Sequence, residues 1–473
     1  MAALMDSEQT ATIDQAWSRL AGLRPRLGED IQRYQHEYRG QNWLILADQD
    51  MERYFRLSVD SEAFLDSLDG QHTVDQIYRE LQGSGNAGLS REDILLLLGN
   101  LKAARLIKLA DDESTEPVKT SGFSLSALAK PFAIRIPLLD PERFLQRVVP
   151  HVHWLPGWLV ILTWLSLVVF ALLASWMHWP ALLEHTAARF DDPVNLLHFW
   201  LLYPLVKALH ELAHAFATKL WGGVVHEMGI MLLVFFPVPY VDSSAANRFS
   251  SRRQRILVSA AGIMMETFLA ALAMLVWVNS SAGLVRDLAF DIMIIGGIST
   301  LLFNANPLLR FDGYYIFSEM IQIPNLYTRA QQYLGYLFQR YLLNISDQRS
   351  PVTAAGEGKW LFAYGLASGL YRIFISLVIA LWVAGKFLVI GLLLAMWAVI
   401  YQLLIPLVKS LFKLYLIARK KQRLLRLLVI FGITAGSLLV AVSVPLHNSS
   451  YTQGIVMLPD DAAVRSQASG IVR

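Results

Sequence analysis

The sequence predicts a polytopic α-helical membrane protein of about seven spans, with a small α/β winged-helix-like N-terminal domain and the start of a β-rich C-terminal module. Of its 473 residues, 55% are hydrophobic and 17% are charged. The mean hydropathy of +0.41 lies well above that of soluble globular chains. The net charge of +3 provides no electrostatic basis for nucleic-acid binding. Cysteine is absent, which excludes disulfides and leaves His, Asp and Glu as the expected metal ligands.

Residues 38–110 are expected to form the small N-terminal domain, after a tail at residues 1–37. Two β-rich segments come first, and three helix-forming segments and a final strand follow them. They cover residues 42–48, 52–58, 61–68, 73–81, 90–101 and 104–109. Residues 111–154 are predicted to be a polar linker and the segment that enters the membrane. The polar start of the chain shows no cleavable signal peptide, so insertion is expected to rely on internal segments.

Residues 155–446 are predicted to be the transmembrane domain, because their apolar segments approach the length of about 20 residues that a bilayer requires. The segments are 155–177, 193–221, 256–278, 288–303, 361–384, 387–411 and 424–446. The fourth is short and is interrupted by Asp291 and Gly296. Basic residues gather between the second and third segments and around the junction of the sixth and seventh. By the positive-inside rule, this distribution predicts a cytoplasmic N-terminus and a periplasmic C-terminus.

The second predicted span contains His210, Glu211 and His214 in the order H-E-x-x-H. In a helix, positions i and i+4 are neighbours on one face, so the two imidazoles could hold one Zn²⁺ at about 2.0–2.1 Å each. Glu211 could then act on a zinc-bound water. The competing interpretation is a structural histidine pair on a helix surface. An ionisable group in an apolar segment is costly, which favours the metal site.

A hydrolytic zinc site needs a third protein ligand and keeps its fourth position for water. The fourth predicted span ends in Asn304, Asn306 and Pro307, and the chain then reaches Asp312 and Gly313. Pro307 breaks the helix, and Gly313 lets the backbone turn beside a charged group. A broken helix at membrane depth is tolerated only where it lines a cavity or is buried in protein. Asp312 is therefore the candidate third ligand.

These paired motifs resemble the site-2 protease family of intramembrane zinc metalloproteases, and most closely its bacterial peptide zinc metalloprotease branch. The resemblance implies a zinc metalloendopeptidase in which His210, His214 and Asp312 hold the metal and Glu211 is the general base. It also implies a multi-pass protein of the bacterial inner (cytoplasmic) membrane. The expected partners are a peptide substrate, membrane lipid, and a peptide exporter or membrane-fusion adaptor.

The same resemblance assigns Asn304 and Asn306 to substrate binding, through amide contacts with the backbone of an unwound peptide. One departure from the family pattern is Arg310, which replaces an apolar residue and could compete for the carboxylate of Asp312. On the third predicted span, Glu266 could make a polar contact near the site.

The flanking regions resemble other parts of that bacterial branch. The segment W-L-I-L-A-D at residues 43–48 and the pair Asp69-Gly70 resemble segments of the PqqD-like domain, a domain that recognises leader peptides. The alternative is a domain that only packs on the membrane part. Residues 447–473 resemble the first half of a periplasmic biotinyl-lipoyl-like adaptor module. Residues 225–242 correspond to a membrane-inserted β-hairpin in the family, which could pair with an extended substrate strand, or to an ordinary re-entrant packing segment.

Two other functions stay open on the sequence. One is a non-proteolytic component of peptide export or membrane fusion that retains the protease fold. The other is a purely structural zinc site, which is disfavoured because such a site would close with a fourth protein ligand and leave Glu211 idle.

Overall fold

The computed structural model of the chain divides into two compact units. The first comprises Met1–Gly335 and Arg349–Ala398, and the second comprises Tyr336–Gln348 and Val399–Arg473. The structure describes residues 14–15, 17–28, 31–48, 53–58, 61–83, 89–103, 106–109, 133–152, 154–191, 193–233, 236–345, 350–420 and 422–443.

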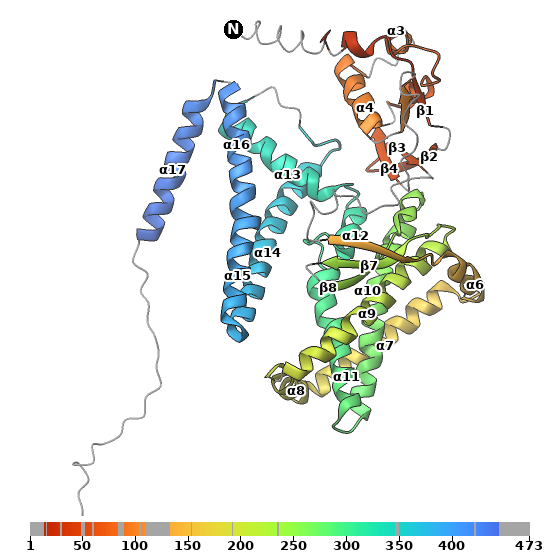
Figure 1. Cartoon of the computed structure of the whole chain (residues 1–473), viewed down its shortest axis with the longest axis vertical. Helices are drawn as coiled ribbons and strands as arrows, with labels where there is room; N and C mark the ends of the chain where they lie inside the picture. The colour runs from red at the N-terminus through yellow and green to blue at the C-terminus, as the bar shows by residue number, and fades with distance from the viewer. Residues whose placement is uncertain are drawn as a thin grey trace, which may run out of the picture. The chain divides into compact units, whose positions relative to one another are not determined.

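The N-terminal part of the first unit is a small domain of strands and helices around one apolar core (Figure 1). An antiparallel sheet has the order β2-β3-β4, and β1 pairs with β5. The elements are β1 (Pro25–Leu27), β2 (Ile31–Tyr38), β3 (Gln41–Asp48), β4 (Arg53–Ser58), α2 (Glu62–Asp66), α3 (Val74–Gly83), α4 (Arg91–Ala103) and β5 (Ile107–Leu109). The predicted order of two strands, three helices and a final strand is confirmed.

The small domain begins earlier than the sequence predicted. The side chain of Trp17 lies in its core, and β1 closes against β5 with Pro25 opposite Leu109. The boundary at residue 38 is therefore wrong, and part of the predicted tail belongs to the domain. Strand β2, which pairs with β3 along its length, also precedes the predicted boundary. The three-residue strand β1 carries too little periodicity to be recognised without its partner.

A second antiparallel sheet has the order β6-β7-β8, with β6 (Ala133–Leu139), β7 (Met228–Leu233) and β8 (Phe236–Val241). The β-hairpin expected in residues 225–242 is confirmed as β7 and β8. In the second half of residues 111–154, the predicted linker and membrane-entry segment, the chain forms β6 and α6 (Glu142–Val152). Residues 111–130 lie outside the described part of the chain.

All seven predicted spans are helical where the structure describes them. The first unit contains α7 (Gly157–Met177), α8 (Trp179–Asp191), α9 (Pro193–Leu220), η2 (Ser244–Arg248), α10 (Arg252–Asn279), α11 (Leu284–Met293), η3 (Ile294–Asn304), α12 (Asp312–Met320), most of α13 (Leu326–Leu337), α14 (Glu357–Lys386) and α15 (Leu388–Ala398).

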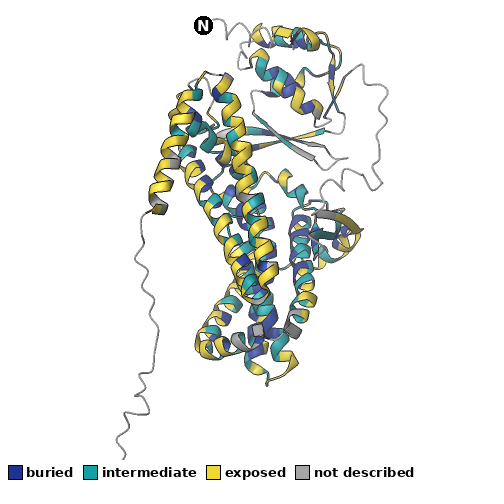
Figure 2. Cartoon of the chain, turned by 60° about the vertical axis from the view of Figure 1, so that its left-hand side comes forward, coloured by how far each residue is buried: buried dark blue, intermediate teal, exposed yellow. Residues whose placement is uncertain are grey.

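Among the described residues, three helices are long and apolar enough to cross a membrane, namely α7, α10 and α14. Large apolar side chains of α7 are exposed, including Leu162, Phe170 and Leu172, and Figure 2 shows exposed residues in yellow along the long helices. An apolar surface of this extent is typical of contact with lipid or with another protein. These helices are compatible with a membrane protein.

The interruption in the fourth predicted span has a structural explanation. The carboxylate of Asp291 is fully buried and pairs with the guanidinium of Arg189 at 2.5 Å. The helix then continues as the π-helical η3, where a Cβ on Gly296 would meet the carbonyl oxygen of Glu266 at 2.5 Å. Asp291 and Gly296 therefore serve ion pairing and close packing against α10.

The second unit contains η4 (Phe338–Leu342), η5 (Val399–Leu404), α16 (Ile405–Lys420) and α17 (Leu424–Ser443). Its core among the described residues is small, formed by Leu343, Ile345, Ala418 and Leu427. The predicted adaptor-like module at residues 447–473 lies outside the described residues.

Candidate metal centre

The motif lies on α9, which is helical from Pro193 to Leu220, as the sequence predicted. One turn of this helix places the imidazoles of His210 and His214 on the same face, with their Nε2 atoms 3.1 Å apart. Both side chains are buried, at 4% and 6% exposure. A pair of imidazole nitrogens this close is well placed to share a cation.

Asp312 joins the pair from the first residue of α12. Its Oδ2 atom lies 3.0 Å from Nε2 of His210 and 3.4 Å from Nε2 of His214. The approach depends on Gly313, because a Cβ there would lie 2.9 Å from the backbone nitrogen of Asn306. The predicted meeting of His210, His214 and Asp312 is therefore confirmed.

The three ligand atoms fit a tetrahedral metal ion. Zinc at about 2.0–2.1 Å from each ligand atom would hold those atoms about 3.3 Å apart. The observed separations run from 3.0 to 3.4 Å. Oδ2 of Asp312 is buried and has no hydrogen-bond partner among the described residues, as expected of an atom that points at a cation. The donor set of two imidazoles and one carboxylate suits zinc.

Helix α10 supplies the outer partners of both histidines. Nδ1 of His214 donates to the carbonyl oxygen of Val258 at 2.7 Å, and Nδ1 of His210 lies 3.1 Å from Oε1 of Glu266. These contacts turn both Nε2 atoms towards the shared point. Between them, Gly262 leaves room for the rings, because a Cβ there would lie 2.5 Å from both Nε2 atoms.

Glu266 is the central residue of a buried polar network. The ammonium group of Lys207 lies 2.5 Å from its Oε1 atom. Its Oε2 atom accepts hydrogen bonds from the hydroxyl of Thr300 and, at 3.0 Å, from Nδ2 of Asn304. The expected polar contact of Glu266 is therefore present. No local sequence pattern marks Lys207 or Thr300 as partners of Glu266. The helical spacing of Val258, Gly262 and Glu266 was a usable signal for the face of α10 that lies against the histidines.

The two asparagines assigned to substrate binding make internal hydrogen bonds. Nδ2 of Asn304 donates a hydrogen bond to Oε2 of Glu266. Oδ1 of Asn306 accepts from the backbone nitrogen of Leu308 at 2.9 Å, and its Nδ2 donates to the carbonyl oxygen of Leu302 at 3.3 Å. Asn306 thus satisfies backbone groups where Pro307 breaks the helix.

Arg310 does not compete for the third ligand. Its guanidinium carbon lies 5.5 Å from the centre of the Tyr327 ring, and it forms no ion pair with Asp312. A cation over an aromatic face is a stable arrangement for an exposed arginine. The carboxylate of Asp312 remains turned towards the histidines.

Glu211 is not one of the three converging ligands. Its Oε2 atom accepts a hydrogen bond from the backbone nitrogen of Val241 at 3.2 Å, at the end of β8. Proline cannot donate to a ladder, so Pro237 and Pro239 turn their nitrogen sides away from β7, and Val241 follows in the same alternation. The outer edge of β8 therefore offers carbonyl acceptors beside the Glu211 carboxylate.

The end of the motif helix is anchored by Glu142 of α6. Its carboxylate accepts hydrogen bonds from the ammonium group of Lys219 and, at 3.1 Å, from the backbone nitrogen of Val225. Burial alone would raise the pKa of Glu142, but the hydrogen bonds from Lys219 and Val225 outweigh burial and the pKa lies below its ordinary value.

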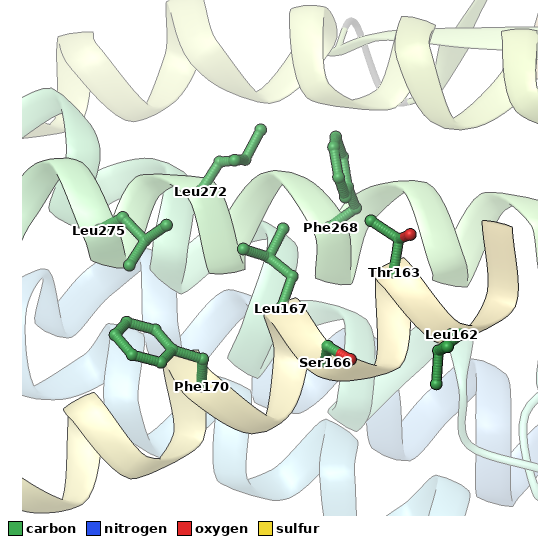
Figure 3. Close-up of a pocket in the computed structure, with 8 residues that line it drawn as sticks. All are labelled: Leu162, Thr163, Ser166, Leu167, Phe170, Phe268, Leu272 and Leu275. Atoms are coloured by element: carbon green, nitrogen blue, oxygen red, sulfur yellow. The ribbon is translucent and has the colours of Figure 1, made fainter. Parts of the chain in front are cut away.

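An apolar groove between α7 and α10 is separate from this centre (Figure 3). It is lined by Leu162, Thr163, Ser166, Leu167, Phe170, Phe268, Leu272 and Leu275. No ionisable side chain lines it, so the groove has no group for acid–base or metal chemistry.

Comparison of the chain with models of protein families, with curated proteins and with solved structures gives no match. The function is therefore inferred from the chemistry of the candidate metal centre.

Proposed function

We propose that this chain is a zinc-dependent intramembrane endopeptidase that hydrolyses a membrane-embedded or membrane-delivered peptide. The observation that carries the proposal is the tetrahedral spacing of His210, His214 and Asp312 beside a second carboxylate, that of Glu211, which is not among them. A structural zinc site would close with a fourth protein ligand. Three described ligands and a neighbouring carboxylate match a hydrolytic site, as the resemblance to site-2 proteases implies.

Zinc, when bound, supplies Lewis-acid activation of water and of a peptide carbonyl. The residues of this chain supply proton transfer and orientation. Glu211 takes a proton from the attacking water and returns it to the leaving amine. The Val241 N–H holds one oxygen of that carboxylate, which fixes the direction of the other. Glu266 and the Val258 carbonyl orient the two imidazoles.

An extended substrate strand along β8 would reach Glu211 directly. Because Pro237 and Pro239 offer no N–H groups, the substrate backbone would donate to the carbonyl oxygens of this edge. Such a one-sided ladder holds a peptide less firmly than a full strand pair and favours its release after cleavage.

The proposal includes the finer topology. Seven helical segments would cross the bacterial inner membrane, with the N-terminus cytoplasmic and the C-terminus periplasmic, supported by the basic residues between the second and third segments. The N-terminal winged-helix-like domain would recruit the peptide. Because the chain has no cysteine, a single Ser450→Cys substitution reports the side of the C-terminus by labelling. Labelling only from the cytoplasm would overturn this topology.

The test of the activity compares wild type with Glu211→Gln in proteoliposomes, measuring bound zinc and cleavage of candidate peptides. We expect the variant to keep zinc and to lose cleavage by about 10²–10⁴-fold, the usual contribution of a general base. Glu184→Gln, an exposed substitution on α8, is the matched control and should retain both properties. A wild type that binds no zinc would refute the metal centre.

The competing function is a non-proteolytic component of peptide export or membrane fusion. It is favoured if wild type and Glu211→Gln bind zinc equally and neither cleaves any peptide that the N-terminal domain binds.

A further inference from the structure

The N-terminal domain contacts the part of the first unit that carries the candidate metal ligands through the β2–β3 hairpin, and its strand β4 also contacts η2. Strands β2 and β3 are joined by a two-residue turn in which Arg39 and Gly40 have φ angles of 51° and 72°. These values belong to the tight turns that favour β-hairpins. Residues 38–41 are called the hairpin tip. Nε of Arg39 donates to the carbonyl oxygen of Ile321 at 3.0 Å, and Nη1 donates to that of Ala355 at 3.2 Å.

Tyr38 of the tip forms a largely buried cluster with Arg255 of α10 and Glu319 of α12, and we call this cluster the clamp. The hydroxyl of Tyr38 donates to Oε1 of Glu319 at 3.2 Å. Arg255 donates to Oε2 of Glu319 from Nε at 3.0 Å and from Nη2 at 2.8 Å. The guanidinium also lies 5.5 Å from the centre of the Tyr38 ring. Tyr38 and Arg255 are 3% and 7% exposed, so the clamp is shielded from solvent screening.

The clamp joins the two helices that aim the metal ligands. Glu319 follows Asp312 by seven residues on α12, which is two turns or about 10.5 Å at 1.5 Å per residue. Arg255 precedes Val258 by one turn on α10, and the carbonyl of Val258 holds the ring of His214. A displacement of the clamp would therefore act on Asp312 and His214 together.

Contacts at both ends of helix α12 limit how far one end could move without the other. At its first turn, a Cβ on Gly313 would overlap the carbonyl of Ala305. At its last turn, the guanidinium of Arg252 donates to the carbonyl oxygen of Met320 at 2.5 Å. A short helix that is packed closely at its first turn and held by a hydrogen bond at its last turn moves as a unit, because packed interfaces do not deform continuously.

We infer that the hairpin tip and the clamp are positioning elements for the metal centre, so that docking of the N-terminal domain sets the affinity of His210, His214 and Asp312 for zinc. This inference rests on the proposed function, and it gives the N-terminal domain a second role beside recruitment. By thermodynamic linkage, zinc strengthens the docking of the hairpin tip by the same factor by which docking strengthens zinc binding.

The experiment measures zinc affinity of the full chain in detergent for Tyr38→Phe and Arg39→Ala. Each substitution removes contacts with α12 or the chain beyond it and touches no ligand. We expect zinc to bind about tenfold more weakly in each, the lower end of the effect of losing an outer partner of a metal site. The matched controls are Tyr34→Phe, whose hydroxyl bonds within β2, and Arg79→Ala, whose partner is Asp75 on α3.

A second measurement is independent of the variants. In the wild type, hydrogen exchange of the backbone amides at residues 39–41 should slow by about tenfold when zinc is added, because linkage is reciprocal. Zinc affinities within about twofold of wild type in both variants, with tip exchange unaffected by zinc, would overturn the inference and leave the proposed protease intact. A wild type that binds no zinc would overturn both.

Discussion

Replacement of Gly262 by alanine should disable the metal centre through a single methyl group. The added Cβ would lie 2.5 Å from Nε2 of both His210 and His214. Ordinary contacts begin at 3.4 Å, so the rings must retreat by about 0.9 Å. Zinc coordination tolerates deviations of about 0.2 Å. The rings cannot retreat freely, because Nδ1 of His214 donates to the Val258 carbonyl and the Glu266 carboxylate lies 3.1 Å from Nδ1 of His210.

We expect Gly262→Ala to weaken zinc binding by at least about 100-fold, the upper end of the effect of disturbing an outer partner. Overpacking should also destabilise the fold by about 1–3 kcal/mol. Zinc content after purification and a titration in zinc buffers measure the first effect, and thermal unfolding in detergent measures the second. The control is Gly369→Ala on α14, where a Cβ would meet nothing within 4 Å.

Wild-type zinc affinity in Gly262→Ala would refute the site geometry, provided that the variant is folded. It would mean that the two Nε2 atoms do not point at a shared ion beside α10. Equal losses in Gly262→Ala and Gly369→Ala would refute the local explanation, because a Cβ at Gly369 would contact none of the ligands.

Three further outcomes are expected. Val241→Pro removes the N–H that holds Glu211, so zinc binding should persist while peptide cleavage slows about tenfold, as for loss of one hydrogen bond to a charged group. Asp291→Ala leaves Arg189 without its fully buried partner and should destabilise the protein by about 3–5 kcal/mol, measured by thermal unfolding. Asp69→Asn should abolish a pH-dependent part of the stability of the N-terminal domain, read by hydrogen exchange of α3 in the full chain.

The sign of the Asp69 effect follows from its hydrogen bonds. Backbone N–H groups of Gln71 and His72, and the His72 ring, lower the pKa of Asp69 to about 2. The stabilisation is present above the unfolded value of 3.8 and is lost as the pH falls towards 2. Wild type and Asp69→Asn should therefore converge near pH 2, and a constant difference between them would contradict the assignment.

The other two predictions have direct controls. Asp287→Ala removes the more exposed carboxylate beside Arg189 and should cost less than about 1 kcal/mol. An Asp291→Ala variant no less stable than Asp287→Ala would show that the buried ion pair is unimportant. Loss of zinc from Val241→Pro would show that the strand end supports the ligands rather than Glu211.

The sequence by itself determined features that depend on local periodicity. The i, i+4 spacing of His210 and His214 places both imidazoles on one helical face wherever the helix lies. The order of elements from β3 to β5 of the small N-terminal domain was predictable for the same reason, since turn residues and alternating apolar positions mark each segment, whereas β1 and β2 were missed. The apolar runs indicated membrane helices, of which three are long and apolar enough in the described structure.

Only the tertiary structure decided which distant groups meet. Asp312 is 98 residues from His214 in the chain, and no local pattern shows that its carboxylate reaches the imidazoles. The same holds for the contact of Tyr38 with Glu319 and for the pairing of β1 with β5. Such contacts depend on how whole helices and strands pack against each other. The packing also showed that the guanidinium of Arg310, which the sequence suggested could compete for the Asp312 carboxylate, lies over the ring of Tyr327.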